Sequence, residues 1–119
     1  MDFNQNLPIY IQIMNLIKDK MASGEICGGD KLASVREFSK ELKVNPNTVQ
    51  RAYQELEREQ LVSTRRGMGT FITDDEKIIK DLKRAMAGDV IESFLNKMEK
   101  LGFTPNEIIH ILSKRMEGK

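Results

Sequence analysis

Two amide side chains, Asn47 and Gln50, lie three residues apart in a stretch with helical periodicity, which places them on one helix face. Amide groups in such positions can form paired hydrogen bonds with N6 and N7 of adenine in the DNA major groove. Arg36 or Arg51 could instead pair with O6 and N7 of guanine. These residue types, at this spacing, predict contacts with base edges.

Two short amphipathic helices between residues 34 and 58 would carry these side chains. The first begins at Ser34, and Glu37 three residues later completes a capping box. The second begins after Asn45, an effective N-cap, with Pro46 at the first helical position, where no amide hydrogen is needed. A short helix, a tight junction and a second helix predict a helix-turn-helix.

A further helix and a hairpin are predicted on either side of this motif. Residues 1–7 are expected to form an extended arm, followed by an amphipathic helix that ends near Ser23. After the second helix, two segments rich in β-branched residues, 61–64 and 69–73, are separated by a turn with glycine and therefore predict a β-hairpin.

The hairpin would be a wing beside the helix-turn-helix. Its tip carries Arg65 and Arg66 beside Gly67, a combination able to approach a phosphate backbone or a minor groove closely. Exposed arginines could also serve solubility alone. Ordering an arginine pair at a glycine turn costs conformational entropy that solubility does not require, which favours the DNA-binding interpretation.

From residue 74 the pattern changes to a long helix through Lys100, in which Gly88 marks either a kink or a break. Thr104 and Pro105 then predict the start of a last helix. These helices expose more apolar surface than about 45 residues can bury on themselves, which predicts a second copy of the chain as partner. A membrane surface is the other candidate, but scattered acidic residues on the polar side argue against it. The expected dimer contacts are Leu82, Met86, Val90, Phe94, Leu95, Met98, Ile108, Ile109 and Leu112.

Length and composition limit the class of protein. A chain of 119 residues, 39% hydrophobic and 31% charged, has room for one compact domain and a small appendage. No apolar run approaches the roughly 18 residues of a membrane span, and no signal-peptide pattern occurs at Met1. The single cysteine, Cys27, agrees with a reducing compartment. We therefore expect a cytoplasmic protein.

The net charge of +1 is small for a protein that binds nucleic acid, where a basic excess is usual. The charges are unevenly distributed, however. Glutamates at positions 55, 57 and 59 lie late in the second helix, whereas four arginines lie in or near the predicted DNA-facing surface. A local basic face is therefore predicted, with a mixed solvated surface as the alternative. The four are Arg36, Arg51, Arg65 and Arg66.

Seven stretches match a known pattern; they occur in order between residues 7 and 72, a region that makes up more than half the chain. They are Leu7-Pro8-Ile9-Tyr10 with Gln12, Gly24, Gly29-Asp30-Lys31-Leu32, Ser34-Val35-Arg36-Glu37, residues 44–53, Leu56-Glu57, and residues 66–72. Through these stretches the chain resembles the winged helix-turn-helix of GntR-family bacterial transcription regulators. Its short all-helical tail resembles the YtrA-type branch of that family.

The resemblance implies a mainly α fold with a small β-hairpin: a DNA-binding domain over residues 1–73 and a helical dimerisation tail over 74–119. We predict a homodimeric repressor that binds a palindromic operator on double-stranded DNA, and the resemblance implies control of a transport operon, since YtrA-type relatives commonly control ABC-type transport operons. Many members carry arginine where Pro46 and Gln50 stand here, so another member's base preference does not transfer. The implied DNA contacts are Arg36, Asn45, Asn47, Thr48, Gln50, Arg66, Gly67 and Thr70.

Other classes of function find less support in the sequence. His110 is the only histidine, and neither a zinc-type Cys/His spacing nor a phosphate-binding glycine loop occurs. No catalytic residue, metal or cofactor is therefore predicted. A winged helix that binds only proteins remains an alternative, which the salt dependence of DNA binding would distinguish. The tail leaves little room for an enclosed ligand pocket, so the identity of any small-molecule effector is unknown.

Overall fold

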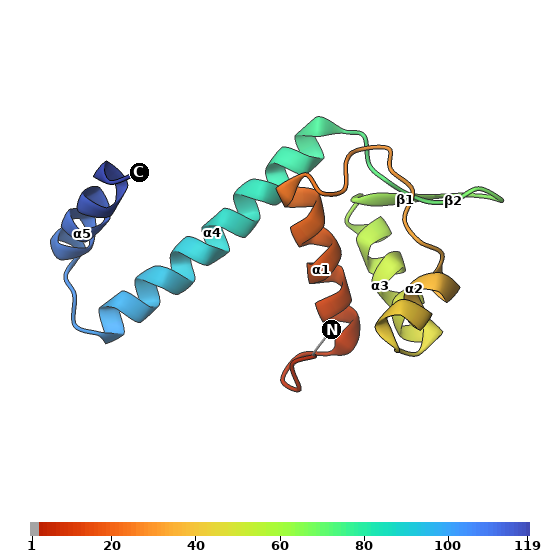
Figure 1. The fold of residues 1–119 in the computed structure, drawn as a ribbon, viewed down its shortest axis with the longest axis horizontal. Helices are drawn as coiled ribbons and strands as arrows, with labels where there is room; N and C mark the ends of the chain where they lie inside the picture. Colours follow the sequence, from red (N-terminus) through yellow and green to blue (C-terminus); the bar gives the residue numbers. More distant parts are fainter. Residues whose placement is uncertain (1–2) are drawn as a thin grey trace. The chain divides into compact units, whose positions relative to one another are not determined.

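The computed structural model describes residues 3–119 and divides into two compact units, Met1–Lys83 and Arg84–Lys119. The chain is mainly helical with one antiparallel hairpin, which confirms the predicted fold class. In chain order the elements are α1 (Ile9–Ser23), α2 (Val35–Leu42), α3 (Pro46–Arg58), β1 (Val62–Arg65), β2 (Gly69–Ile72), α4 (Glu76–Lys100) and α5 (Pro105–Glu117), labelled in Figure 1.

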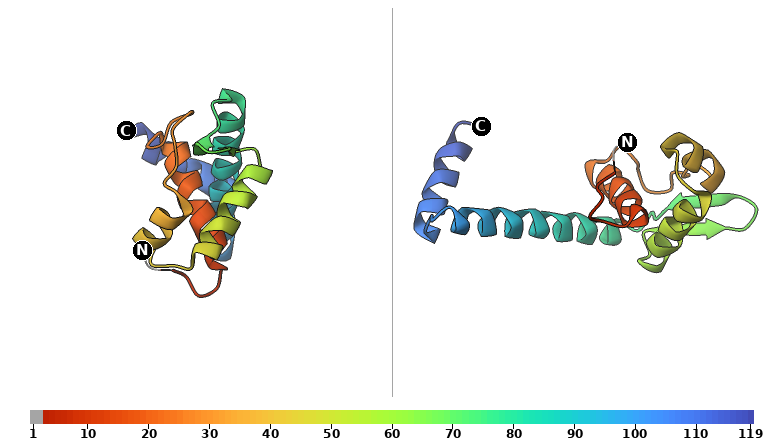
Figure 2. Two further views of the ribbon diagram at one scale, coloured as in Figure 1. Left: turned by 90° about the vertical axis from the view of Figure 1, so that its right-hand side faces the viewer. Right: turned by 90° about the horizontal axis from the view of Figure 1, so that it is seen from below.

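The first unit is built around one apolar core. Helix α1 lies along α3, α2 packs against α3, and the hairpin extends beyond the helices, as Figures 1 and 2 show. Every third or fourth residue of α3 is buried, as helical periodicity requires of an amphipathic helix. The buried core residues are Ile13, Met14, Ile17, Met21, Leu32, Phe38, Val49, Ala52, Tyr53, Leu56, Leu61, Val62 and Ile72.

The predicted helix boundaries are confirmed by their caps. Ser34 Oγ accepts a hydrogen bond from the Glu37 amide at 3.1 Å, and the Glu37 carboxylate accepts one from the Ser34 amide at 3.2 Å. The same reciprocal arrangement joins Thr104 and Glu107 at the start of α5. Since each cap satisfies amides that no helical carbonyl can reach, these helices begin where their sequences predict.

The N-terminal arm is not extended, so this prediction is wrong for residues 4–7. The chain turns there and is held by the buried side chain of Gln12. Gln12 accepts a hydrogen bond from the Asn4 amide at 2.7 Å and donates to the carbonyls of Asn4 and Leu7. A buried amide requires partners, and this segment supplies three. The first two residues of the predicted arm lie outside the described residues.

The wing has one more backbone partner than the sequence predicts. The β1–β2 register pairs Val62 with Ile72 and Arg65 with Gly69, so Arg65 ends β1 instead of lying in the turn. Lys31 forms an isolated antiparallel bridge to Phe71 on the free edge of β2. No strand pairing at Lys31 is predicted from the sequence. This edge pairing ties the hairpin to the segment that precedes α2.

Helix α4 continues through Gly88 without a break. Its first turns belong to the first unit, because Ile78, Ile79 and Leu82 pack against that unit's core. The compact units therefore divide within α4, whereas the predicted functional boundary precedes it. Within the second unit, Ile108 is the one buried residue among those described.

Candidate nucleic-acid interface

Helix α3 separates a buried face from an exposed one. Val49 and Leu56 are fully buried, whereas Asn47 and Gln50 are exposed on the other side. The two amides are therefore free of the core and point to solvent, as base contacts require. The predicted position of both residues on the exposed face of the helix is confirmed, whereas their contact with base edges stays a prediction.

Asn45 has a structural role at the start of α3. Its Oδ1 accepts a hydrogen bond from the Asn47 amide at 2.8 Å, which makes Asn45 the N-cap. The oxygen is committed to the helix, whereas the amide nitrogen keeps two hydrogens for donation. Asn45 is thus suited to donate to a phosphate or carbonyl oxygen. Paired hydrogen bonds with adenine would need its side-chain oxygen as well as its amide nitrogen. Thr48, one turn into the helix, is half-buried.

The wing tip brings backbone and cationic side chains together. Arg66 and Gly67 are both exposed in the turn, which is closed by a hydrogen bond from the Met68 amide to the Arg65 carbonyl at 2.9 Å. Gly67 has φ +74°, a conformation that other residues rarely adopt. Thr70 is half-buried, and its carbonyl accepts a hydrogen bond from the Leu32 amide at 2.8 Å.

Two of the predicted arginines lie over aromatic rings. The Arg51 guanidinium carbon is 3.9 Å from the ring centroid of Tyr10 in α1, and that of Arg65 is 4.4 Å from the ring of Phe71. Both distances are within the range of cation–π attraction. Arg36, at the start of α2, is exposed. Sequence reasoning did not identify either ring as part of this surface.

Lys31, in the segment between α1 and α2, is a cation beside the wing that sequence reasoning also missed. Its side chain crosses over Gly69, where an added Cβ would lie 2.7 Å from Lys31 Cε. The side chain is exposed, and its backbone bridges to β2. Since the bridge is long-range, the order of residues along the chain gives no signal for it.

The acidic end of α3 is partly neutralised by local partners. Glu55 forms an ion pair with Arg58 at 2.9 Å, and Glu59 forms one with Lys18 of α1 at 2.9 Å. These pairs lie toward the C-terminal end of the helix, away from Asn47. A chain of net charge +1 can therefore still present uncompensated cations beside the exposed amides.

Tyr53 fixes α3 to the segment before α2. Its hydroxyl donates a hydrogen bond to the Ala33 carbonyl at 2.8 Å, and its ring packs 6.2 Å from that of Phe38. Burial, with a smaller contribution from Glu41 and Glu37, raises the pKa of the Tyr53 phenol well above its ordinary value. The phenol therefore stays neutral and keeps its proton for the carbonyl.

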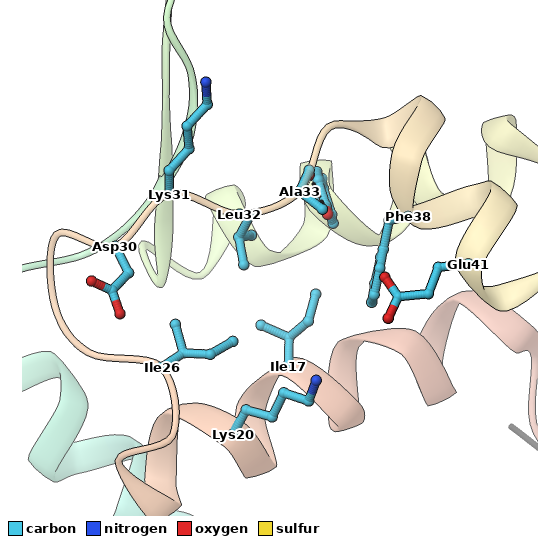
Figure 3. Close-up of a pocket in the computed structure, with 10 residues that line it drawn as sticks. Ile17, Lys20, Ile26, Asp30, Lys31, Leu32, Ala33, Phe38 and Glu41 are labelled. Carbon is cyan, nitrogen blue, oxygen red and sulfur yellow. Dashed lines mark hydrogen bonds between the residues drawn. The ribbon is translucent and has the colours of Figure 1, made fainter.

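A cavity of about 400 Å³ lies on the inner side of α3, next to Tyr53, and Figure 3 shows the residues that line it. Its walls come from α1, α2, α3 and the segment between α1 and α2. None of the predicted DNA contacts lines the cavity, so it is separate from the exposed face of α3. The lining residues are Ile17, Lys20, Ile26, Asp30, Lys31, Leu32, Ala33, Phe38, Glu41 and Tyr53.

Across residues 3–119, no cluster of histidine, cysteine and acidic side chains has the arrangement of a metal site. Over the same residues, no helix combines the length and apolar character that crossing a membrane would need. The single histidine, His110, is exposed on α5.

The helix pair, the exposed amides of α3 and the adjacent arginine-bearing hairpin define a winged helix-turn-helix DNA-binding domain of a transcriptional regulator. Residues 9–72 match the family model described as "Bacterial regulatory proteins, gntR family". This match covers more than half of the chain, and the chain belongs to the GntR family.

The similarity extends beyond the winged helix. The chain is 43% identical over 116 residues to the "Uncharacterized HTH-type transcriptional regulator YhcF" of Bacillus subtilis, a match that covers 98% of this chain and 96% of YhcF. It is 46% identical over 76 residues to the "HTH-type transcriptional repressor YtrA" of the same organism, covering 64% of this chain and 58% of YtrA. The similarity to YtrA confirms the resemblance to the YtrA-type branch.

A solved GntR-family transcriptional regulator from Listeria monocytogenes has the same fold. It superimposes with a TM-score of 0.86 at 41% sequence identity, covering 94% of this chain and 98% of that protein. The likeness includes the helical tail, since nearly the full length of both chains is matched.

Proposed function

We propose that the chain is a homodimeric repressor that recognises a palindromic operator. The observation that carries this proposal is the exposure of Asn47 and Gln50 on a helix whose opposite face is buried. In a two-fold dimer, two such helices would enter successive major grooves, about 34–36 Å apart. The printed description of YtrA as a repressor supports the direction of control.

The proposed DNA contacts divide into two groups. Asn47, Thr48 and Gln50 would contact base edges from α3, with Arg36 or Arg51 available for guanine. The remaining contacts would go to the backbone or minor groove and hold the domain in place. This second group comprises Asn45, Arg65, Arg66, Gly67 and Thr70.

Gln50→Ala and Arg66→Ala test this division. We expect Gln50→Ala to relax base choice, because it removes a base contact, and Arg66→Ala to weaken binding to all sequences alike. Selection from a random duplex pool measures preference, and fluorescence anisotropy at several salt concentrations measures affinity. The wild-type slope of log affinity against log salt should be near −0.9 per phosphate contact. Equal loss of preference in both variants would contradict the assigned roles, and a flat salt response would favour a protein-binding module.

The proposed dimer contact lies in the second unit. Val90, Leu95, Ile109 and Leu112 are exposed there, and so are three large apolar residues outside the predicted set, among them Ile91. A monomer that exposes this much apolar surface in so few residues is unusual, which supports a second copy as its cover. Two predicted contacts are less available, since Leu82 packs against the first unit's core and Ile108 is 4% exposed. The other predicted contacts, Met86, Phe94 and Met98, are half-buried.

Leu95→Glu in the full chain tests this contact. A charge buried in an apolar interface is costly, so we expect the variant to be monomeric at concentrations where the wild type is a dimer. The matched control is Leu7→Glu, since Leu7 is 43% exposed and Leu95 is 37% exposed. Sedimentation equilibrium gives the masses. A fully dimeric Leu95→Glu variant would count against this surface.

Control of an ABC-type transport operon is the part of the proposal that depends on the YtrA-type relationship alone. Operator sequences recovered by selection from a genomic DNA library would locate the target genes. Recovery of sites only in front of genes unrelated to transport would remove this part and leave the DNA-binding proposal intact.

A further inference from the structure

Arg51 and Arg58 lie on the same helix but have different partners. Arg58 forms an ion pair with Glu55, so its charge is compensated within the protein. Arg51 contacts the Tyr10 ring, and within residues 3–119 its guanidinium forms no ion pair or hydrogen bond. A ring face attracts the cation without neutralising it and leaves the five in-plane N–H donors available.

The Arg51–Tyr10 pair lies beside the residues expected to contact DNA. One shallow hollow on the surface is lined by Tyr10 and Arg51 together with Asn45, Asn47 and Thr48. Tyr10 is half-buried and Arg51 is exposed, so the ring is the inner, packed partner and the guanidinium lies on its solvent side. The Tyr10 ring comes from α1, which packs along α3.

The wing repeats the same arrangement. In the hairpin register Arg65 faces Gly69, so Phe71 is its diagonal neighbour on the same face. The Arg65 guanidinium lies 4.4 Å from the Phe71 ring centroid and, within residues 3–119, has no carboxylate partner. Phe71 is half-buried, and its backbone is held by the bridge to Lys31.

We infer that Tyr10 and Phe71 are positioning residues that hold the guanidinium groups of Arg51 and Arg65 ready for DNA. A free arginine side chain loses rotamer freedom when it binds, which weakens the contact. Stacking on a ring removes part of that freedom before binding and keeps the full positive charge. The inference rests on the proposed function, in which both arginines contact DNA.

A double-mutant cycle tests the Tyr10 contribution in the full chain. We expect Tyr10→Leu to weaken binding to a duplex selected by the wild type about two- to fivefold, the range of an exposed cation–π contact. Tyr10→Phe keeps the ring and should bind as the wild type does. In an Arg51→Ala background, Tyr10→Leu should have no further effect, because the group that the ring positions is gone.

A comparison of two arginine variants of α3 shows whether DNA binding depends on the guanidinium that the Tyr10 ring holds. Arg51→Ala should weaken binding to the selected duplex; a loss of preference for guanine at one position would show a base contact, and a salt slope lower by about one would show a phosphate contact. The control Arg58→Ala removes the same charge from the same helix but should leave the slope and affinity unchanged. The wing is tested in parallel with Phe71→Leu and Arg65→Ala, with Phe71→Tyr as the conservative variant.

An NMR measurement on the free protein tests the inference without using DNA affinity, which a folding defect would also lower. Protons held over an aromatic face are shifted upfield in NMR spectra, so the Arg51 side-chain Hε should be shifted in the wild type and in Tyr10→Phe. The shift should be absent in Tyr10→Leu. An unshifted Hε in the wild type would overturn the inference for this pair.

The outcomes distinguish the inference from the proposed function. If the wild type shows no salt-dependent binding to selected DNA, the proposed function fails. If it binds and Tyr10→Leu weakens affinity equally with and without Arg51, Tyr10 acts through the fold and the inference fails alone. If Arg51→Ala binds as the wild type does, the positioning of Arg51 is also overturned, while DNA binding through α3 and the wing stands.

Discussion

The two compact units obtain their order from different sources. The first has a continuous core shared by α1, α2, α3 and the hairpin, in which Ile13, Val49 and Leu56 are fully buried. Among the residues described in the second, Ile108 alone is buried, although α4 and α5 are well formed. Isolated helices are only marginally stable in water. Helices α4 and α5 have good caps but almost no buried core, so we expect a partner to stabilise them strongly. The two units thus differ in whether they have a complete hydrophobic core of their own.

The largest expected effect is in the core of the first unit. Leu56→Ala should lower the free energy of unfolding by about 2–5 kcal/mol, because it removes fully buried atoms and leaves a cavity. Urea denaturation followed by circular dichroism measures it. Leu101→Ala, at a residue 72% exposed in the second unit, should have no detectable cost in dilute solution. A cost for Leu101→Ala that grows with protein concentration would show that a second copy covers this residue.

The two capping boxes allow the same change to be compared in both units. Ser34→Ala and Thr104→Ala should each cost about 0.5–2 kcal/mol, because an amide at the start of α2 or α5 loses its acceptor. In the first unit the loss should appear as a lower urea midpoint, and in the second as faster hydrogen exchange confined to α5. Ser113→Ala, inside α5, is the control and should cost nothing. Loss of global stability with Thr104→Ala would contradict the expectation that this cap stabilises α5 alone.

A smaller effect is expected at Gly88, inside α4. Gly88→Ala should stabilise the helix by about 1 kcal/mol, because alanine has the higher helix propensity and the added Cβ would meet no atom beyond the adjacent backbone of α4. Slower amide hydrogen exchange in α4 measures it. Gly69→Ala should instead destabilise the wing, since Gly69 has φ +120° and the added Cβ would meet Lys31. Unchanged exchange in α4 after Gly88→Ala would indicate that contacts other than local propensity limit this helix.

The smallest expected effect is a loss of stability in acid. Hydrogen bonds from the Ser34 hydroxyl and amide lower the pKa of Glu37, and those from Thr104 lower the pKa of Glu107. A carboxylate whose pKa is lowered by folding stabilises the protein above its ordinary pKa, and this contribution is lost as pH falls through the lowered value. Thermal unfolding midpoints between about pH 6 and pH 3 measure it. Glu37→Gln keeps the capping box and should reduce this acid dependence; an unchanged profile would contradict the assignment.

Local features of the fold were predictable because the interactions that create them span one turn of chain. The start of α3 follows from Asn45 and Pro46, and the start of α5 from Thr104 and Pro105, since a cap and an N1 proline act within a few residues. The continuity of α4 was not decided by its sequence pattern, because one glycine lowers helix propensity without excluding the helix.

Only the exposed side chains of the candidate site were predictable from the sequence. The exposed positions of Asn47 and Gln50 follow from the period of α3, and the arginines of the wing follow from the hairpin turn. The rings beneath Arg51 and Arg65 were not predicted. The Phe71 contact could have been found from the hairpin register, whereas the Tyr10 contact depends on how α1 packs against α3.

The order of helices and hairpin, their caps and the exposed amides follow from the amino-acid sequence alone, since short-range periodicity and turn chemistry are sufficient for these. Three contacts could be found only in the folded chain: Gln12 holds the N-terminal turn, Lys31 pairs with β2, and the Tyr10 ring lies against Arg51. Each of these contacts joins residues whose proximity is created by packing of the core. Hydrophobic burial is non-directional, so the pattern shows which faces are buried but leaves their partners to the assembled fold.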